Sequence, residues 1–361
     1  MGSPQVCVRC ILTDKTPGII FDGDGVCNFC KIHEPISLQP ESKLREVLDV
    51  FRKKDKKWDC MVGLSGGRDS TYVLWKLVND YQMKVLAVTY DNPFASEQAR
   101  RNIERALRTL NVDGLRWGFP KDVHRKATGK YLRIWSRNPS SVLIPLVCAH
   151  CKSWWPGFFR IARENDIPLV VIGSNPLETA SFKEAGFGGA RTYHRLSKLP
   201  KVLTRTIKEV AANPQYLTTS WRMVLRMYLG ASHSTPYLKW RYKDITVLRL
   251  FDYLKWDEKE VESTIARNLG WQKSPEVASS WRFDCRLDYV RRLMYSSTVG
   301  VTELRDLFSK MIREKQLTRV EALERIKRED LVPQVLVEQV LGEFDLRLSD
   351  LNLKIDSELL L

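Results

Sequence analysis

The sequence predicts an α/β fold with a doubly wound parallel sheet, an N-terminal zinc ribbon and a helical C-terminal region. Three observations predict it. Short apolar runs alternate with amphipathic segments between residues 58 and 173, two Cys-x2-Cys pairs stand near the N-terminus, and helical patterns fill the chain after about residue 190. Strands that are apolar throughout are typical of a parallel sheet with helices on both faces. We therefore expect a zinc-ribbon module at 1–35, a doubly wound domain at 40–190 and a helical, basic region at 191–361.

The N-terminal cysteines have the spacing of a metal site. Cys7 and Cys10 form one Cys-x2-Cys pair and Cys27 and Cys30 form another, with 16 residues between the pairs. Two such pairs offer four thiolates to one tetrahedral zinc ion, and the metal replaces the core that so short a segment cannot bury. A shell of four cysteines leaves no open position, so we expect this zinc to be structural.

The other elements follow from hydrophobic periodicity in chain order. Residues 41–57 are expected to form a charged helix with one apolar stripe. Strands are expected at 59–64, 84–90, near Leu115 and at 167–173, with helices at 70–80, 96–110, 121–135 and 154–165. After residue 190 we expect helices at 244–256, 257–270, 287–297, 301–316, 318–329 and 332–342. Several of them begin with Ser, Thr or Asp at the N-cap position.

Composition limits the class of protein. The chain has 361 residues, 43% of them hydrophobic, which is typical of a globular protein with one large or two ordinary domains. No apolar run approaches the roughly 20 residues that span a bilayer, and no signal-peptide core is present, so we expect a cytoplasmic protein without a transmembrane segment. The net charge is +15, and residues 191–250 contribute +10 of it. This window is either a solvated basic face or a surface for phosphate groups.

The stretch MVGLSGGRDSTY, from Met61 to Tyr72, has the chemistry of an anion-binding loop. A strand-to-helix junction leaves backbone N–H groups at the helix N-terminus unpaired and positively polarised. Gly66 and Gly67 allow a sharp turn and a close approach to phosphate, and the hydroxyls of Ser65 and Ser70 can donate hydrogen bonds to it. No Walker lysine follows the glycines, so the loop is not that of a P-loop NTPase.

The SGGRDS stretch resembles the SGGxDS pyrophosphate loop (PP-loop) of the N-type ATP pyrophosphatases, which cleave ATP to AMP and pyrophosphate. The resemblance implies that residues 40–190 are the PP-loop domain and that Asp69 faces pyrophosphate through Mg²⁺. It makes Ser65 and Asp69 the candidate catalytic residues. The loop residues expected to bind ATP or pyrophosphate are Ser65, Gly66, Gly67, Arg68, Asp69 and Ser70.

Two later segments resemble the adenosine-binding parts of the same family. Thr89, Tyr90, Asp91 and Asn92 stand at the end of the second expected strand, where that family holds adenine and ribose. Residues 173–179 read GSNPLET and resemble the family element G-H-N-x-D-D-x-x-E-T, except that Leu177 replaces an acid and Ser174 the histidine. The match supports an adenosine pocket more than a second set of magnesium ligands. The additional ATP-binding candidates are Tyr90, Asp91, Gly173 and Asn175.

A second group of cysteines lies further along the chain. Cys148 and Cys151 form a Cys-x2-Cys pair, which is compatible with a redox pair, half a metal site or two small core residues. Together with the distant Cys285, the pair resembles the three cysteines that hold an iron–sulfur cluster over the ATP site in the tRNA 2-thiolation branch of the superfamily. The resemblance implies a second metal or a [4Fe-4S] cluster with one open iron. Cys60, inside an apolar strand, is expected to be a small buried residue.

The chain as a whole resembles the N-acetyl sugar amidotransferases of surface-polysaccharide and nonulosonic-acid biosynthesis, including that of lipopolysaccharide. The segments that carry the resemblance are CVRCILTDKTPGIIFDGDGVCNFC, SGGRDSTYVLWKL, VLAVTYDN, LGWQKSPEVASSWRFDC and LTRVEALERIK. The resemblance implies ATP-dependent conversion of an acetamido group on a nucleotide-linked sugar to an acetamidino group through an adenylated intermediate. Nothing in the chain suggests a glutaminase triad, so the ammonia is expected from a HisH-like glutaminase with a HisF-like partner.

Two other functions compete with this one. A tRNA sulfurtransferase would use the same adenylation with sulfide, and the basic window would bind RNA. A zinc-ribbon nucleic-acid adaptor would leave the phosphate loop unexplained. The elements around Trp271 and Trp281 favour the sugar enzyme. The sequence does not assign the general base, and its candidates are Glu178, Asp284, Arg282 and His150.

Overall fold

The computed structural model describes residues 4–52, 54–178, 199–215, 230, 232–353 and 359–360. Thr179 of the GSNPLET element and much of the basic window at 191–250 lie outside the described residues. In the described part of the chain, no helix is long and apolar enough to cross a membrane.

A five-stranded parallel sheet forms the centre of the molecule, with the strand order β3-β2-β1-β4-β5. Its strands are β1 (Cys60–Gly63), β2 (Val85–Tyr90), β3 (Asp113–Trp117), β4 (Leu169–Ile172) and β5 (Thr246–Arg249). All four strand pairs are parallel. The α/β fold predicted from the sequence is therefore confirmed, as are the four strands expected between residues 58 and 173.

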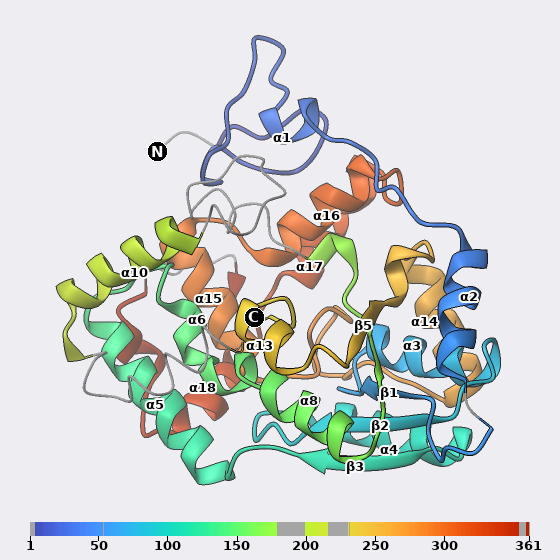
Figure 1. Ribbon diagram of the computed structural model, residues 1–361. Coiled ribbons are helices and arrows are strands. Elements are labelled where there is room, and N and C mark those ends of the chain that lie inside the picture. Colours follow the sequence, from blue (N-terminus) through green and yellow to red (C-terminus); the bar gives the residue numbers. More distant parts are fainter. Residues whose placement is uncertain are drawn as a thin grey trace.

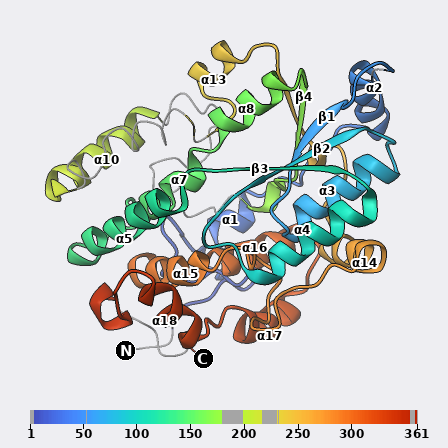
Figure 2. The same ribbon diagram turned by 90° about the horizontal axis from the view of Figure 1, so that it is seen from below.

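Helices cover both faces of the sheet, as Figure 2 shows. Before β4 the helices are α1 (Asn28–Lys31), α2 (Glu41–Phe51), α3 (Arg68–Asn79), α4 (Glu97–Leu110), α5 (Lys121–Arg137), α6 (Ile144–Val147), α7 (Ala149–Lys152) and α8 (Trp155–Glu164). Later helices are η1 (Pro176–Glu178), α10 (Leu199–Ala212), α13 (Pro236–Arg241), η3 (Leu250–Asp252), α14 (Glu258–Leu269), α15 (Leu287–Val299), α16 (Glu303–Arg313), α17 (Arg319–Glu329), α18 (Gln334–Gly342) and η4 (Leu348–Leu351).

The strands divide their side chains between two hydrophobic clusters because successive residues of a strand point to opposite faces. On β1, Val62 packs in the cluster that contains the apolar faces of α3, α4 and α14. Its neighbour Met61 packs in the cluster of α8. Both residues are fully buried. This double burial explains why the strands read as continuous apolar runs in the sequence.

The expectation of a helix at 244–256 was wrong. Residues Thr246 to Arg249 form β5, which extends the sheet beyond β4, and a short 3-10 helix follows at Leu250–Asp252. Thr246 N–H donates to the carbonyl of Pro168 at 2.8 Å, which aligns the new strand with the sheet edge. Only Leu248 of this edge strand is buried. A four-residue strand with one buried side chain carries no alternation that periodicity can detect, and pairing with β4 overrides local propensity.

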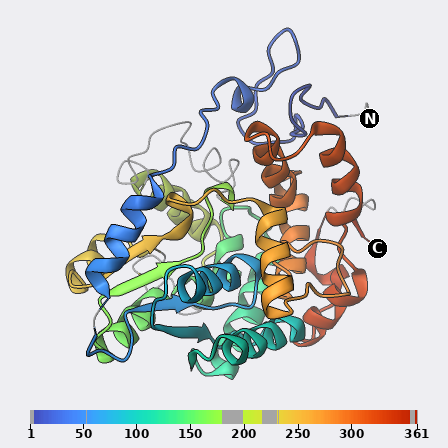
Figure 3. The ribbon, with the colours of Figure 1, turned by 90° about the vertical axis from the view of Figure 1, so that its right-hand side faces the viewer.

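A third hydrophobic cluster joins the two ends of the chain. Cys7, Cys10 and Leu12 of the N-terminal module pack in one cluster with residues of α5, α15 and α18. The module sits beside the C-terminal helices in the view of Figure 3. The guanidinium of Arg319, on α17, donates to the carbonyls of Cys7 and Cys10 at 3.2 and 3.1 Å. The metal-binding module is thus packed against the C-terminal helices rather than tethered loosely to the sheet.

Candidate active site and metal centres

The glycine-rich loop leaves β1 at its C-terminal end. The chain runs from β1 to β2 and β3 on one side, whereas β4 lies on the other side of β1. In open α/β sheets this reversal of strand order opens a crevice in which ligands bind. Helix α3 begins directly after the loop, with Gly67 at its N-cap. Because glycine has no side chain to cap a helix, the first N–H groups of α3 are available to an anion.

Gly66 fixes the turn of the loop. Its φ is +81°, and a Cβ at this position would lie 2.2 Å from the carbonyl oxygen of Ala99 on α4. Its own carbonyl accepts hydrogen bonds from Asn102 Nδ2 at 3.2 Å and Trp271 Nε1 at 3.0 Å. The loop therefore combines a left-handed residue, close backbone packing and two side-chain anchors.

Substitution of Gly66 by alanine is expected to lower the free energy of unfolding by about 2–4 kcal/mol, because the left-handed backbone is strained and a backbone oxygen must move. Urea denaturation measures the change. Gly342→Ala is the matched control, since nothing lies within 4 Å of a Cβ there, and it should change stability by less than about 1 kcal/mol. Equal denaturation midpoints for Gly66→Ala and the unmodified protein would contradict the argument.

The serine hydroxyls of the loop are preorganised. Ser65 Oγ and Ser70 Oγ lie 3.1 Å apart, and Ser70 Oγ also accepts from the backbone N–H of Ser65 at 3.1 Å. Ser65 Oγ accepts from the N–H of Gly67 at 3.2 Å. These contacts bring the two predicted phosphate-binding hydroxyls to the start of α3, where backbone N–H groups can share an anion with them.

Two side chains hold the carboxylate of Asp69. Trp256 Nε1 donates to Oδ1 at 2.9 Å, and Asn175 Nδ2 donates to Oδ2 at 2.8 Å. The N–H of Leu177 donates to Asn175 Oδ1 at 2.9 Å, which fixes the orientation of that amide. Gly173 packs close by, since a Cβ there would lie 3.0 Å from the carbonyl oxygen of Asp69. The loop and the GSNPLET element, predicted separately, meet at Asp69.

Arg68 is buried and acts as an anchor. Its guanidinium donates to Glu258 Oε1 at 2.6 Å and to Ser280 Oγ at 2.7 Å, and it stacks over the ring of Trp256. Only 4% of the residue is exposed. Because its side chain is engaged with α14 and the segment that follows, we expect Arg68 to contact pyrophosphate through its backbone.

Three carboxyl groups surround the loop. Burial raises the pKa of Glu178 to about 7 and Asp69 raises it further, while Arg282 and Arg68 oppose the shift. Burial also raises the pKa of Asp284, whose Oδ2 would lie 3.3 Å from a Cβ on Gly67. Carboxylates that raise the pKa of a neighbour form the kind of oxygen-rich site that a divalent cation relieves. Asp69, Glu178 and Asp284 therefore fit a magnesium ion beside bound phosphate.

The segment from Trp271 to Cys285 packs around the loop, which the sequence did not reveal. Trp271 contacts Gly66, Ser280 contacts Arg68, and Asp284 lies against Gly67. These contacts join residues about 200 positions apart, and no local pattern predicts them. A groove of about 1140 Å³ lies beside this segment, lined mainly by α14 and residues 271–278.

The predicted adenosine residues Tyr90 and Asp91 stand at the end of β2. The Tyr90 hydroxyl lies 3.3 Å from Nδ1 of His124, and burial raises the pKa of this tyrosine well above its ordinary value. Lys121 pairs with Asp91 at 3.5 Å. These side chains are on the strand next to β1, at the same edge of the sheet as the phosphate loop.

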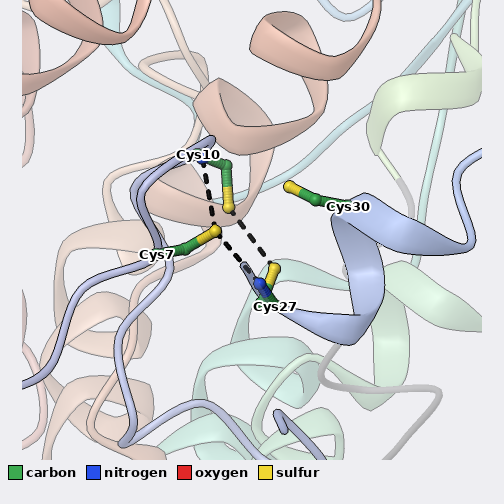
Figure 4. Close-up of side chains that lie close together, drawn as sticks. All are labelled: Cys7, Cys10, Cys27 and Cys30. Atoms are coloured by element: carbon green, nitrogen blue, oxygen red, sulfur yellow. Dashed lines mark hydrogen bonds between the residues drawn. The ribbon is translucent and has the colours of Figure 1, made fainter. Parts of the chain in front are cut away.

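The four N-terminal cysteines fit one zinc ion. Their sulfur atoms all lie within 4.8 Å of one another, and they are the one such group of ligands in the part of the chain that the structure describes. Figure 4 shows the thiols pointing toward a common centre. Cys10 Sγ and Cys27 Sγ are 3.7 Å apart, close to the ~3.8 Å edge of a tetrahedron with zinc–sulfur bonds of about 2.3 Å. Cys7 Sγ accepts from the N–H groups of Cys10 and Cys27, as a thiolate ligand does.

Substitution of Cys27 by serine should remove one zinc ion per chain and lower the denaturation midpoint, since structural zinc supplies folding free energy to such modules. Metal analysis and urea denaturation measure both effects. Cys60→Ala is the control for zinc content, because the Cys60 thiol is fully buried in β1, as expected, and belongs to another cluster. A Cys27→Ser protein with unchanged zinc content would show that these cysteines do not form the site.

The second group of cysteines is also brought together. Cys148, Cys151 and Cys285 lie in or against one hydrophobic cluster. Burial raises the pKa of Cys285 to about 12, and the Cys148 thiol raises it further. Burial likewise raises the pKa of Cys151, with contributions from Cys148 and Cys285. Asn92 Nδ2 donates to Cys285 Sγ at 3.3 Å. Uncharged thiols would be inert here, whereas a bound metal or cluster would stabilise thiolates.

Comparison with known proteins adds little about activity. No protein-family model matches the chain. A stretch of 111 residues is 28% identical to an uncharacterized protein of Methanocaldococcus jannaschii, and the match covers 30% of this chain and 40% of that protein. NMN synthetase from Francisella tularensis aligns at 14% identity over 85% of this chain and 95% of its own, with a TM-score of 0.38. The U34-tRNA thiolase NcsA from Methanococcus maripaludis, with its [4Fe-4S] cluster, aligns at 14% identity over 88% of each chain, with a TM-score of 0.33.

Proposed function

We propose that the protein is an ATP-dependent N-acetyl sugar amidotransferase that releases AMP and pyrophosphate. The observation that carries the proposal is the SGGRDS loop at the point where the strand order reverses, with Asp69 held by Asn175 and Trp256. This arrangement supports a PP-loop ATP pyrophosphatase. We further propose that the acceptor is a nucleotide-linked sugar and that the product enters surface-polysaccharide biosynthesis.

The proposed reaction has two steps. The acetamido oxygen attacks the α-phosphorus of ATP, the bond to the bridging oxygen of the β-phosphate breaks, and pyrophosphate leaves as the amide proton is lost. Ammonia then attacks the carbon of the O-adenylated imidate, the bond from that carbon to the AMP oxygen breaks, and the sugar retains an acetamidine. The chemistry needs an environment that holds a leaving anion and orients a weak nucleophile.

The chain supplies that environment through the loop. The first N–H groups of α3 and the hydroxyls of Ser65 and Ser70 would bind the departing pyrophosphate. Asp69, with Glu178 and Asp284 near it, would hold Mg²⁺, which neutralises phosphate charge when bound. Glu178, with a pKa of about 7, can accept or release a proton near neutral pH, and we propose it as the group that accepts the proton of the attacking ammonia.

The segment around Trp271 favours a sugar acceptor over RNA. Residues 269–285 carry part of the resemblance to the sugar amidotransferases, and they pack directly on the phosphate loop through Trp271, Ser280 and Asp284. The ammonia would come from a HisH-like glutaminase through a HisF-like partner, as the resemblance implies. The rival function, tRNA thiolation, is favoured by the proximity of Cys148, Cys151 and Cys285.

Mass spectrometry of candidate substrates tests the proposal. Anaerobically prepared protein is incubated with ATP and magnesium, in one arm with isotope-labelled ammonium and UDP-linked acetamido sugars, and in the other with sulfide and unmodified tRNA. We expect a sugar in which NH has replaced oxygen, carrying the label and formed in equal amount with AMP. Unchanged sugars together with thiolated tRNA would overturn the amidotransferase proposal and support the sulfurtransferase.

A further inference from the structure

The buried histidine His124 lies beside the second group of cysteines. It is on α5, fully buried, and its Nε2 is 3.7 Å from the Sγ of Cys151. Its Nδ1 is 3.3 Å from the hydroxyl of Tyr90. The ring stacks on that of His150 at 4.8 Å. The sequence offered no signal for this position, because His124 is 24 residues from the first cysteine of the pair and shows no ligand spacing with it.

We propose that His124 and the three cysteines Cys148, Cys151 and Cys285 form a second metal centre with four protein ligands, three thiolates and one imidazole. The chemical class of its occupant is a thiophilic metal, either zinc or an iron–sulfur cluster, since both accept this ligand set. The inference does not depend on the amidotransferase activity, and metal analysis tests it without any substrate.

The contact between His124 and Cys151 has the dimensions of two ligands on one ion. Zinc–nitrogen bonds of about 2.0 Å and zinc–sulfur bonds of about 2.3 Å, at a tetrahedral angle, separate the two ligand atoms by ~3.6 Å. The separation of 3.7 Å agrees with this value. The four ligand atoms as a set are spaced more widely than those of the N-terminal site, which all lie within 4.8 Å, so a single ion would draw Cys148 and Cys285 inward by side-chain rotation.

The surroundings of the four residues resemble those that support metal ligands elsewhere. A metal-bound histidine usually donates its other N–H to a neighbouring acceptor, which sets the tautomer. The Tyr90 hydroxyl is placed to accept from Nδ1 of His124, leaving the lone pair of Nε2 toward Cys151. Asn92 donates to the Sγ of Cys285, and such hydrogen bonds stabilise a ligating thiolate. Tyr90 and Asn92 would therefore be positioning residues for the centre.

Four protein ligands have a consequence for the choice between the two proposed reactions. A cluster held by three cysteines keeps one iron open for sulfide, whereas a centre closed by His124 has no open position for a substrate. The centre would then brace the end of β2 against α5, α7 and the loop that contains Cys285. This role suits an enzyme whose chemistry takes place on ATP alone.

Metal analysis of the whole protein, expressed with zinc and iron and purified anaerobically, tests the proposal. Zinc, iron and sulfide are counted per chain for the unmodified protein, His124→Ala, His124→Cys and His150→Gln. We expect two centres in the unmodified protein and at least a tenfold loss of the second in His124→Ala, with one N-terminal zinc retained as evidence of folding. His124→Cys should restore the second centre, and His150→Gln should keep it.

The spectroscopic arm separates the two occupants. If the centre holds iron, pulsed electron paramagnetic resonance of the reduced protein should show coupling to a nitrogen nucleus that disappears in His124→Ala. If it holds zinc, cobalt substitution should give a tetrahedral spectrum of three thiolates and one nitrogen. Tyr90→Phe should weaken metal affinity about 10–100-fold in competition with a chelator. A single metal in the unmodified protein, or a second centre unchanged in His124→Ala, would overturn the proposal and leave a simple S–H to imidazole hydrogen bond.

Discussion

Replacing Asp69 with asparagine should reduce AMP formation by about 10²–10³-fold, the usual cost of losing one group that stabilises developing charge. The carboxylate accepts hydrogen bonds from Trp256 and Asn175, so its position is set before any ligand binds. Asparagine keeps the shape but loses the charge that faces magnesium, and its NH₂ group would meet one of the two donors. The loss should appear in kcat more than in stability.

Coupled measurement of AMP and pyrophosphate release gives the rate, and circular dichroism tests the fold. The matched control is Asp80→Asn, which changes an acid at the C-terminal end of the same helix whose partner is Lys76 on the surface. It should leave the rate within twofold. An Asp69→Asn protein that forms AMP at the original rate would remove Asp69 from the mechanism.

Substitution of Arg68 by alanine should lower the free energy of unfolding by about 3–5 kcal/mol at pH 7, because it breaks a buried ion pair and leaves Glu258 without one of its partners. Glu258 keeps Arg325 at 2.7 Å, which places the loss toward the lower end of that range. Arg45→Ala is the control. It removes an exposed pair with Glu41 of similar length, and such pairs contribute close to nothing.

The effect of Arg68 should depend on pH in a defined direction. Burial acts to raise the pKa of Glu258, but Arg68 and Arg325 outweigh it and hold the pKa below its ordinary value. A carboxyl group with a depressed pKa in the folded state contributes stability above its unfolded pKa and loses it as pH falls through the folded value. The difference between the unmodified protein and Arg68→Ala should therefore shrink below about pH 4. Urea denaturation at pH 7 and pH 4 measures it, and a difference that grows on acidification would contradict this account.

Much of the fold could be predicted because its signals are local. The strands β1, β2 and β4 are buried on both faces, and the helices between them carry regular apolar stripes, so periodicity located each of them. Strand β5 escaped because an edge strand with one buried residue has no such signal. The four-cysteine site was predictable from spacing alone, since two short pairs must converge on one ion.

The candidate site could be predicted only in part, for a physical reason. The residues of SGGRDS are contiguous, so their chemistry is visible in the sequence. Their supports are not: Trp256 reaches Asp69 from 187 positions away, and Trp271 reaches Gly66 from 205. His124 meets Cys151 because α5 and α7 pack in one cluster. Contacts of this kind depend on tertiary packing, which leaves no periodic trace.

The distance along the chain between Asp69 and Trp256 has a consequence for protein synthesis. A ribosome that adds 5–20 residues per second would need roughly 10–40 seconds to pass from the loop to the tryptophan that orients its carboxylate. Throughout this interval β1, β2 and β3 can pair, but the nascent chain lacks β5 and all the side chains between Trp256 and Asp284 that hold the loop. The phosphate loop is therefore among the first parts of the sheet to be made and among the last to become competent.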